Sequence, residues 1–189
     1  DFQAALETKP EKAIKLEKDA LAQIENITAD NARLVSNLHA NLGGLYRMNG
    51  HPDLAREHME KSISLLDQFN LLHINDSIPQ IANYAMFLTE QQEPERGISE
   101  LQKLSGIIKE YHSDDCLDYA KVQETLGTIY LMTANLPQAK THFKRAFKIY
   151  EKIWADEPEM IEAKYQEIQE LYPQIGFCIG KNLSGLLTK

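Results

Sequence analysis

The chain has 189 residues, 43% hydrophobic and 25% charged, which is the composition of an ordinary folded protein and excludes extensive disorder. A formal net charge of -8 argues against nucleic acid or an anionic membrane as the partner, because neutralising phosphates requires clustered Lys and Arg. No apolar run is long enough to span a membrane, and the first residues lack the pattern of a secretory signal, so we expect a cytoplasmic protein.

Apolar residues recur at helical spacing from the start of the chain. Residues 1–8 are expected to end one helix, because Pro10 favours the first turn of a new helix that continues to about Asn26. After a capping turn at 28–30, a second helix is predicted over 31–48. Its expected core residues are Leu34, Val35, Leu38, Leu42, Leu45 and Tyr46.

Gly50 is placed to end that helix in the left-handed conformation, and Pro52 opens a partner helix that runs to about Phe69. Two similar pairs are predicted at 78–92 with 94–111, and at 115–134 with 137–154. Past Pro158 the pattern weakens, and we expect capping helices over 157–187 that cover the end of the stack.

The residues before the third pair, Ser113, Asp114 and Asp115, favour a helix cap with a stabilising dipole charge. An acid or metal site beside His112 is the alternative. The two cysteines, Cys116 and Cys178, have neither a C-x-x-C motif nor a local histidine cluster, so we expect isolated buried thiols and no cofactor.

Several columns of residues return every 42 positions, and a period of this length indicates stacked supersecondary units. We therefore predict an all-α fold of antiparallel helix pairs in a single domain, 1–189, with small residues where helices approach closely. Its parts are a partial repeat at 1–28, repeats at about 30–70, 76–111 and 114–154, and the capping helices. The columns are Pro10, Pro52 and Pro94; Ala13, Ala55, Gly97 and Ala139; Gly43, Ala85 and Gly127; and Ala20, Ser62, Leu104 and Ala146.

These columns resemble a known repeat family. Leu42-Gly43-x-x-Tyr46 with Ala55 and Met59 resembles the L-G-x-x-Y and A-x-x-x-F signature of tetratricopeptide repeats, and so does the set Leu126, Gly127, Tyr130, Ala139 and Phe143. The period of 42 is similar to the longer repeats of kinesin light chain. The resemblance implies a right-handed superhelix, an α-solenoid, whose first helices line a concave groove that binds extended peptides or helices.

The resemblance also implies an asparagine just before each L-G pair, where its amide contacts the backbone of a bound peptide. Asn41 and Asn83 match, whereas Thr125 occupies the third place. A hydrogen bond within the stack is the alternative role for both asparagines, and plain surface charge is the alternative for Arg47 and Lys121. With steps of three and four residues on the same face, the expected peptide-binding groove comprises Asn37, Asn41, Arg47, Asn83, Met86, Thr89, Lys121, Glu124 and Thr128.

One stripe of basic residues departs from the acidic average of the chain. The stripe consists of Lys140, Lys144, Lys148 and Lys152, and the segment that follows, 156–170, is acidic. We expect the two to be solvated or to neutralise each other between neighbouring helices. A patch for an acidic ligand is the alternative.

A catalytic interpretation finds no support in the sequence. The histidines are scattered, no H-E-x-x-H motif occurs, and the stretch with Gly176, Gly180 and Lys181 lacks the spacing of a phosphate-binding loop. We therefore expect a non-enzymatic scaffold for a protein or peptide partner. Two alternatives are a sensory or regulatory region of a larger signalling regulator or enzyme, and self-association through the incomplete first repeat.

Overall fold

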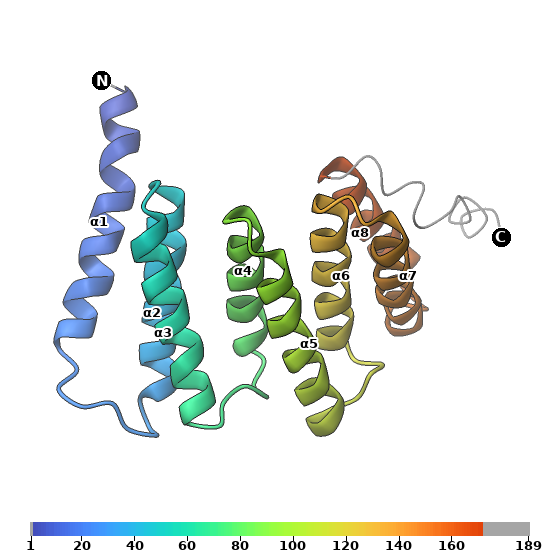
Figure 1. Cartoon of the computed structure of the whole chain (residues 1–189), viewed down its shortest axis with the longest axis horizontal. Helices are drawn as coiled ribbons and strands as arrows, with labels where there is room; N and C mark the ends of the chain where they lie inside the picture. The colour runs from blue at the N-terminus through green and yellow to red at the C-terminus, as the bar shows by residue number, and fades with distance from the viewer. Residues whose placement is uncertain (1, 172–189) are drawn as a thin grey trace. The chain divides into compact units, whose positions relative to one another are not determined.

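The computed structural model describes residues 2–171, and these residues form eight α-helices and no strand (Figure 1). Side-chain surroundings are described for residues 10–170. The helices are α1 (Phe2–Ala22), α2 (Ala32–Met48), α3 (Pro52–Gln68), α4 (Ser77–Glu90), α5 (Pro94–Tyr111), α6 (Leu117–Met132), α7 (Leu136–Ile153) and α8 (Pro158–Leu171). The prediction of an all-helical chain is confirmed for the described residues.

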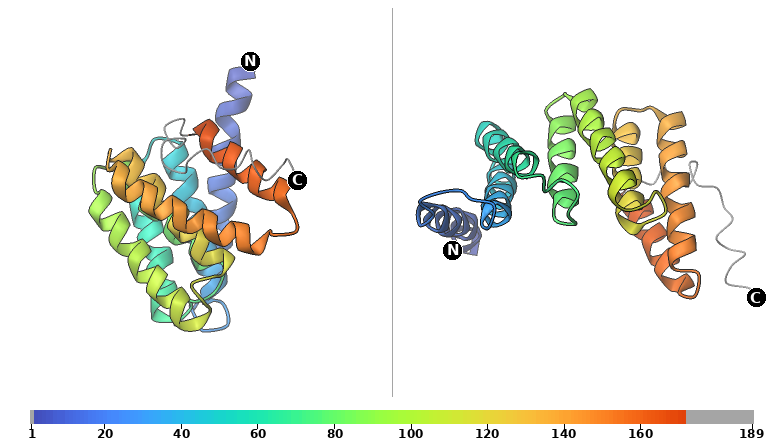
Figure 2. Two further views of the ribbon diagram at one scale, coloured as in Figure 1. Left: turned by 90° about the vertical axis from the view of Figure 1, so that its right-hand side faces the viewer. Right: turned by 90° about the horizontal axis from the view of Figure 1, so that it is seen from below.

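The chain divides into two compact units between Leu88 and Thr89. The first unit holds α1, α2, α3 and most of α4, and the second holds α5 to α8. Helix α2 packs along α3 in the first unit, and α6 packs along α7 in the second, as the ribbon views show (Figure 2). The predicted helix pairs 30–70 and 114–154 are these two hairpins.

The turn inside each repeat uses one residue with a left-handed backbone. Gly50, Gln92 and Ala134 have φ of 73°, 65° and 59°, and they occupy the same place in successive repeats. At Gly50 the next amide, that of His51, donates to the carbonyl of Tyr46 at 2.9 Å. The matching bond from Asn135 to Tyr130 is 2.7 Å long, so both turns close the helix in the Schellman manner.

The core of the first unit surrounds the hairpin of α2 and α3. A cluster of seven buried residues is formed by Leu42, Tyr46, Ala55, Met59, Tyr84, Phe87 and Leu88. Ile14 and Leu21 of α1 pack against this cluster. A Cβ atom added to Gly43 would lie 3.3 Å from the carbonyl oxygen of Ala55 and 3.2 Å from the amide nitrogen of Met59, so a larger residue would separate the two helices.

The core of the second unit repeats this packing with larger side chains. A Cβ atom at Gly127 would lie 3.0 Å from the ring of Phe143, which is fully buried. Helix α8 places Ile161 and Ile168 in buried positions, and the rings of Tyr165 and Phe147 meet edge to face at 6.0 Å. The contact of α8 with α7 suits the predicted capping role, while residues 172–187 of the predicted cap lie outside the described residues.

Several local predictions are wrong. Helix α1 continues through Pro10 without the expected break, because proline fixes φ near the helical value and its ring costs one hydrogen bond without forcing a stop. Leu34 is 56% exposed and not part of the core, since it lies between the buried positions Ala32 and Val35 at the start of α2.

The start of the third pair also differs from prediction. The N-cap of α6 is Cys116, whose sulfur accepts a bond from the amide of Tyr119 at 3.4 Å, and the aspartates before it do not cap the helix. The side chain of Ser113 instead accepts a bond from the amide of Asp115 within the preceding turn. Cys116 is half-buried, whereas a buried thiol was expected. Cys178 lies outside the described residues.

Candidate functional site

A hollow of about 400 Å³ lies between α2 and α4, the first helices of two successive repeats. It collects three of the predicted groove residues, Asn37, Asn41 and Asn83. The other lining residues are Ala40, Asp76, Pro79 and Gln80. All seven belong to the first unit, so this surface lies within one compact unit.

Asn37 is held in place by a chain of hydrogen bonds that begins in the core. Gln80 Oε1 lies 2.8 Å from the hydroxyl of Ser36 and 2.5 Å from that of Ser62, and both serines are fully buried. Since this oxygen accepts from the hydroxyls, the Nε2 group of Gln80 remains to donate, and it lies 2.5 Å from Asn37 Oδ1. The amide nitrogen of Asn37 is thereby turned toward Asp76, at 3.4 Å.

Asp76 forms the rim of the hollow in the loop before α4. Its carboxylate accepts a 2.6 Å hydrogen bond from Arg33, and this bond holds the pKa of Asp76 below its usual range. The pair is exposed, so its contribution to stability is small. Its consequence for the site is that Arg33 balances the charge beside the amides.

The two asparagines of the predicted ladder differ in their surroundings. Asn41 is exposed and donates to Glu17 of α1 at 3.0 Å, which is the intra-stack bond considered as its alternative role. The other oxygen of Glu17 is buried without a partner among the described residues. Asn83 is exposed and has no hydrogen bond to another described side chain, so its amide is available to a ligand.

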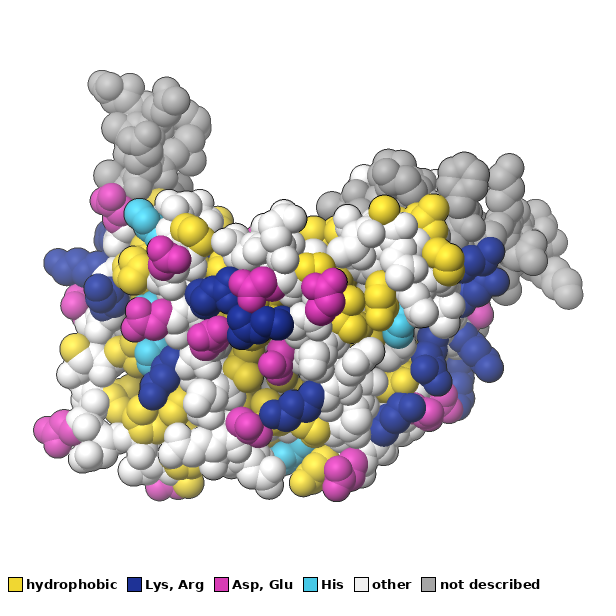
Figure 3. Space-filling model, viewed as in Figure 1, with side chains coloured by type: hydrophobic (Ala, Val, Ile, Leu, Met, Phe, Trp, Pro, Cys, Tyr) yellow, Lys and Arg dark blue, Asp and Glu magenta, His cyan; other side chains and the backbone are white. Residues whose placement is uncertain are grey.

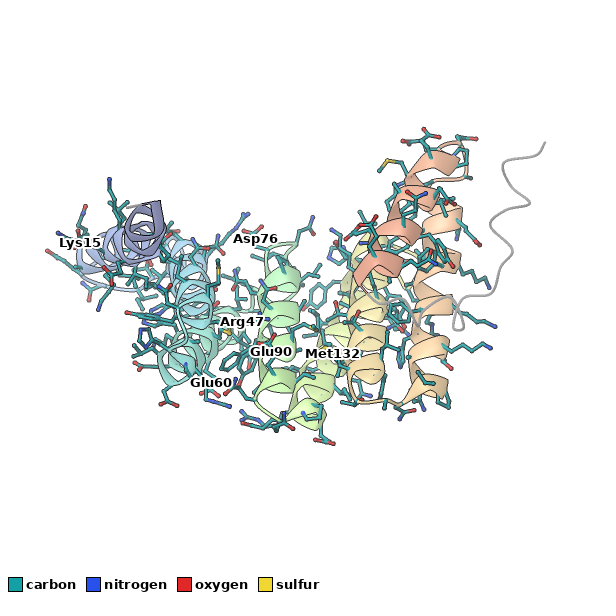
Figure 4. The ribbon with its side chains drawn as sticks, turned by 90° about the horizontal axis from the view of Figure 1, so that it is seen from above. Lys15, Arg47, Glu60, Asp76, Glu90 and Met132 are labelled. Atoms are coloured by element: carbon teal, nitrogen blue, oxygen red, sulfur yellow. The ribbon has the colours of Figure 1, made fainter. Side chains whose placement is uncertain are left out.

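The remaining predicted residues of the first unit lie outside the hollow. Arg47 and Met86 are half-buried and do not line it. Figure 4 shows Arg47 and Asp76 at separate places along this side of the unit. The groove role of both residues stays a prediction.

In the second unit, Glu124 takes part in internal contacts. Its carboxylate accepts a 2.6 Å bond from the hydroxyl of Tyr150 and pairs with Lys164 at 2.9 Å. Burial, followed by the charge of Glu124, raises the pKa of Tyr150 far above its usual value, so this hydroxyl stays protonated and donates. Burial acts to lower the pKa of Lys164, but Glu124 and Glu167 hold it above its usual value.

Lys121, Thr89 and Thr128 offer different amounts of surface. Lys121 is exposed and lies 3.8 Å from the carboxylate of Asp118, one turn earlier on α6. Thr89 and Thr128 are only 8% and 9% exposed, so their side chains present little surface to a ligand. Thr125, at the third ladder position, bonds back to the carbonyl of Lys121 at 3.0 Å.

Gln80, Ser36, Ser62 and Asp76 were not predicted as parts of the site. Gln80 occupies the column of Leu38 and Val122, so a polar residue in an otherwise apolar column was the available signal. The buried serines gave no such signal, because small residues at these positions are also explained by close helix packing.

Histidines form a second repeated arrangement that the sequence reasoning missed. The ring of His58 stacks on that of Tyr46 at 5.4 Å, and the ring of His142 stacks on that of Tyr130 at 5.3 Å in the same repeat position. His58 Nδ1 lies 2.8 Å from Nδ1 of His39, while His142 Nδ1 lies 2.9 Å from Gln123 Oε1. Burial, followed by the nearby His58 and Lys61, lowers the pKa of His39 to about 4.

The described part of the chain shows neither a metal-binding cluster nor a membrane-spanning helix. Residues 2–171 bring together no group of three or more His, Cys, Asp or Glu side chains suited to hold a metal ion. None of the described helices is both long and apolar enough to cross a membrane.

Comparison with known proteins gives a family match for one part of the chain and a similar fold for most of it. A family model described as tetratricopeptide repeat matches residues 77–152. Among solved structures, BtubC (BKLC) from P. vanneervenii is similar with a TM-score of 0.71 at 19% identity, over 91% of this chain and 68% of that one. No curated protein sequence matches the chain. The repeat model thus matches residues 77–152, less than half of the chain, and the structural similarity shows an α-solenoid fold.

Proposed function

We propose that this protein is a non-enzymatic scaffold that binds an extended protein segment in the hollow between α2 and α4. Tetratricopeptide repeats generally mediate protein–protein interaction, and the site within this chain is the new element. The observation that carries the proposal is the convergence of Asn37, Asn41 and Asn83, from two helices, on one hollow.

The chemistry of the lining favours recognition of a peptide backbone. A primary amide has two donors and an acceptor, so it pairs with both the N–H and the C=O groups of an extended chain. Asn83 is available at one side of the hollow, and Asn41 uses one of its N–H groups on Glu17. Neither Lys nor Arg is among the lining residues, so a clamp for a terminal carboxylate is disfavoured.

The buried network gives this surface a defined polarity. Because Gln80 fixes the oxygen of Asn37 toward the core, the N–H groups of Asn37 face the rim and the hollow. A preorganised amide costs less ordering entropy when a ligand binds. The hollow therefore suits a segment that presents backbone carbonyls toward Asn37.

The test uses peptides selected from a random displayed library on the immobilised full chain. We expect the double variant Asn41→Ala with Asn83→Ala to weaken binding of the selected peptides about tenfold, since two amide contacts are lost. The matched control removes two exposed amides that do not line the hollow, Gln68→Ala with Gln102→Ala, and should bind as the unaltered protein does. Equal affinity of all three proteins for every selected peptide would refute the site.

A further inference from the structure

We infer that the second unit carries a separate docking site for an acidic protein segment, on α7 and the loop before α6. A hollow of about 530 Å³ is lined there by Arg145, Lys148, Ile149 and Lys152 of α7, and by Asp114 and Asp115 of the loop. It shares no residue with the hollow between α2 and α4, so the inference does not depend on the function proposed for that surface.

Positive charge is concentrated on this helix of an acidic protein. Helix α7 contains five basic residues, Lys140, Lys144, Arg145, Lys148 and Lys152, and one acidic residue, Glu151. Figure 3 shows Lys and Arg side chains gathered at the edge where α7 lies. The expected neutralisation by the acidic segment 156–170 does not extend to the hollow, where Lys152 pairs with Asp115 of the loop.

The two aspartates of the lining already form ion pairs within the protein. Asp115 pairs with Lys152, and this contact holds the pKa of Asp115 below its usual range, so the aspartate is charged near neutral pH. Asp114 lies 3.9 Å from Lys109. Within the described residues, neither Arg145 nor Lys148 forms a salt bridge with a carboxylate, although the charge of Lys148 also helps to lower the pKa of Asp115. Both cations can therefore still pair with a carboxylate of a ligand.

Arg145 is held ready for such a ligand by an aromatic ring. Its guanidinium lies 5.6 Å from the centre of the ring of Tyr119, which is buried. This contact already restrains the Arg145 side chain, so less rotamer entropy is lost when a ligand binds. A guanidinium pairs with a carboxylate through two parallel hydrogen bonds. Lys148 follows one turn later, about 4.5 Å along the helix axis, within reach of the next acidic side chain of the same segment.

The surroundings favour an acidic peptide over nucleic acid. Two fixed carboxylates at the wall would repel a continuous phosphate backbone, whereas individual Glu or Asp side chains can avoid them. The net charge of -8 gives no general attraction for nucleic acid. Ile149 is buried beneath the charged residues of the lining, so recognition depends mainly on the charges.

The experiment measures fluorescence anisotropy with three labelled probes and the full chain. The probes are a short peptide that alternates Glu with Gly, the same peptide with Gln in place of Glu, and a thymidine oligonucleotide of matched charge. We expect the Glu peptide to bind, the Gln peptide not to bind, and the affinity to fall as salt is added.

Two double variants with the same change in charge identify the hollow. Arg145→Glu with Lys148→Glu should weaken binding of the Glu peptide about tenfold or more, whereas Lys140→Glu with Lys144→Glu, on the same helix outside the lining, should weaken it less than about twofold. Lys148→Glu alone keeps the contact of Arg145 with Tyr119, and its loss of binding tests the site without disturbing that packing.

Three results would overturn the inference. Equal losses in both double variants would mean a diffuse attraction with no defined site. Tighter binding of the oligonucleotide would assign the surface to nucleic acid. Sedimentation of the unaltered chain as a dimer that Lys148→Glu dissociates would assign it to a second copy.

Discussion

At the scale of single residues, two adjacent glycines of α2 have opposite roles. A Cβ atom at Gly43 would meet the backbone of α3, whereas one at Gly44 would meet nothing within 4 Å. We expect Gly43→Ala to lower the free energy of unfolding by about 1–3 kcal/mol through overpacking, and Gly44→Ala to raise it by up to about 1 kcal/mol through helix propensity. Urea denaturation of both variants checks this, and equal effects would contradict the assigned helix contact.

The left-handed turn residue gives a second prediction at this scale. Ala134 adopts φ of 59°, which strains any residue with a Cβ atom, while Gly50 adopts φ of 73° at the same repeat position without strain. Ala134→Gly should therefore raise the free energy of unfolding by about 1 kcal/mol, and Gly50→Ala should lower it by a similar amount. Thermal unfolding of the two variants is the measurement, and a loss of stability in Ala134→Gly would show that the turn is not strained.

The pair of His39 and His58 predicts a dependence on pH. Burial, followed by His58 and Lys61, lowers the pKa of His39 to about 4, and burial also lowers that of His58, so the folded state favours the neutral rings. Their contribution to stability is complete above the unfolded pKa of about 6.5 and is lost as the pH falls from there toward about 4.

The equivalent pair of the second unit indicates a neutral replacement for His39. His142 meets Gln123 where His58 meets His39, and a glutamine accepts from an imidazole without carrying a charge of its own. His39→Gln should reduce the loss of stability between pH 6.5 and 4 by roughly 1–2 kcal/mol. Denaturant midpoints across this range are the measurement, and an unchanged pH profile would mean that His39 does not titrate with folding.

At the scale of elements, α8 is attached to its unit through Glu124 as well as through apolar contacts. This carboxylate accepts from Tyr150 of α7 and pairs with Lys164 of α8, so it ties three helices together. Glu124→Ala should leave a half-buried ammonium without its closest partner and cost about 1–3 kcal/mol. Faster hydrogen exchange of the amides of α8 in this variant is the measurement. Unchanged exchange would mean that Glu124 does not hold α8 in place and is available to a ligand.

At the scale of the whole molecule, stability in a stacked-repeat fold is a sum of local interfaces. The chain divides between Leu88 and Thr89, and Gly43 belongs to the first unit. The Gly43→Ala variant should therefore lose amide protection mainly in α2 and α3, with little change in α6 and α7. Native-state hydrogen exchange is the measurement, and a uniform loss along residues 2–171 would show that the described helices unfold as one cooperative unit.

Repeat spacing made most of the fold predictable. The column of Gly43 and Gly127 predicted close helix contacts, and the structure shows them at Ala55 and Met59 for Gly43 and at Phe143 for Gly127. A small residue has few other reasons to recur at a fixed period. The predictions of a helix start at Pro10 and of a cap by the aspartates before α6 were wrong, since a proline or a capping residue indicates only a local preference. Helix α1 tolerates Pro10 because proline has a helical φ, and the sulfur of Cys116 caps α6 in place of the aspartates.

By itself the sequence determined the helices, the repeat period and the columns where helices meet, because these depend on short-range periodicity and on side-chain size. Tertiary structure alone decided which polar residues share a surface. It brought Asn37, Asn41 and Asn83 to one hollow and used Gln80 to orient the first of them. It also turned Glu124 into an internal contact and left Arg145 and Lys148 without a salt bridge to a carboxylate within the described residues. Such outcomes depend on distances between residues far apart in the chain, which periodicity does not encode.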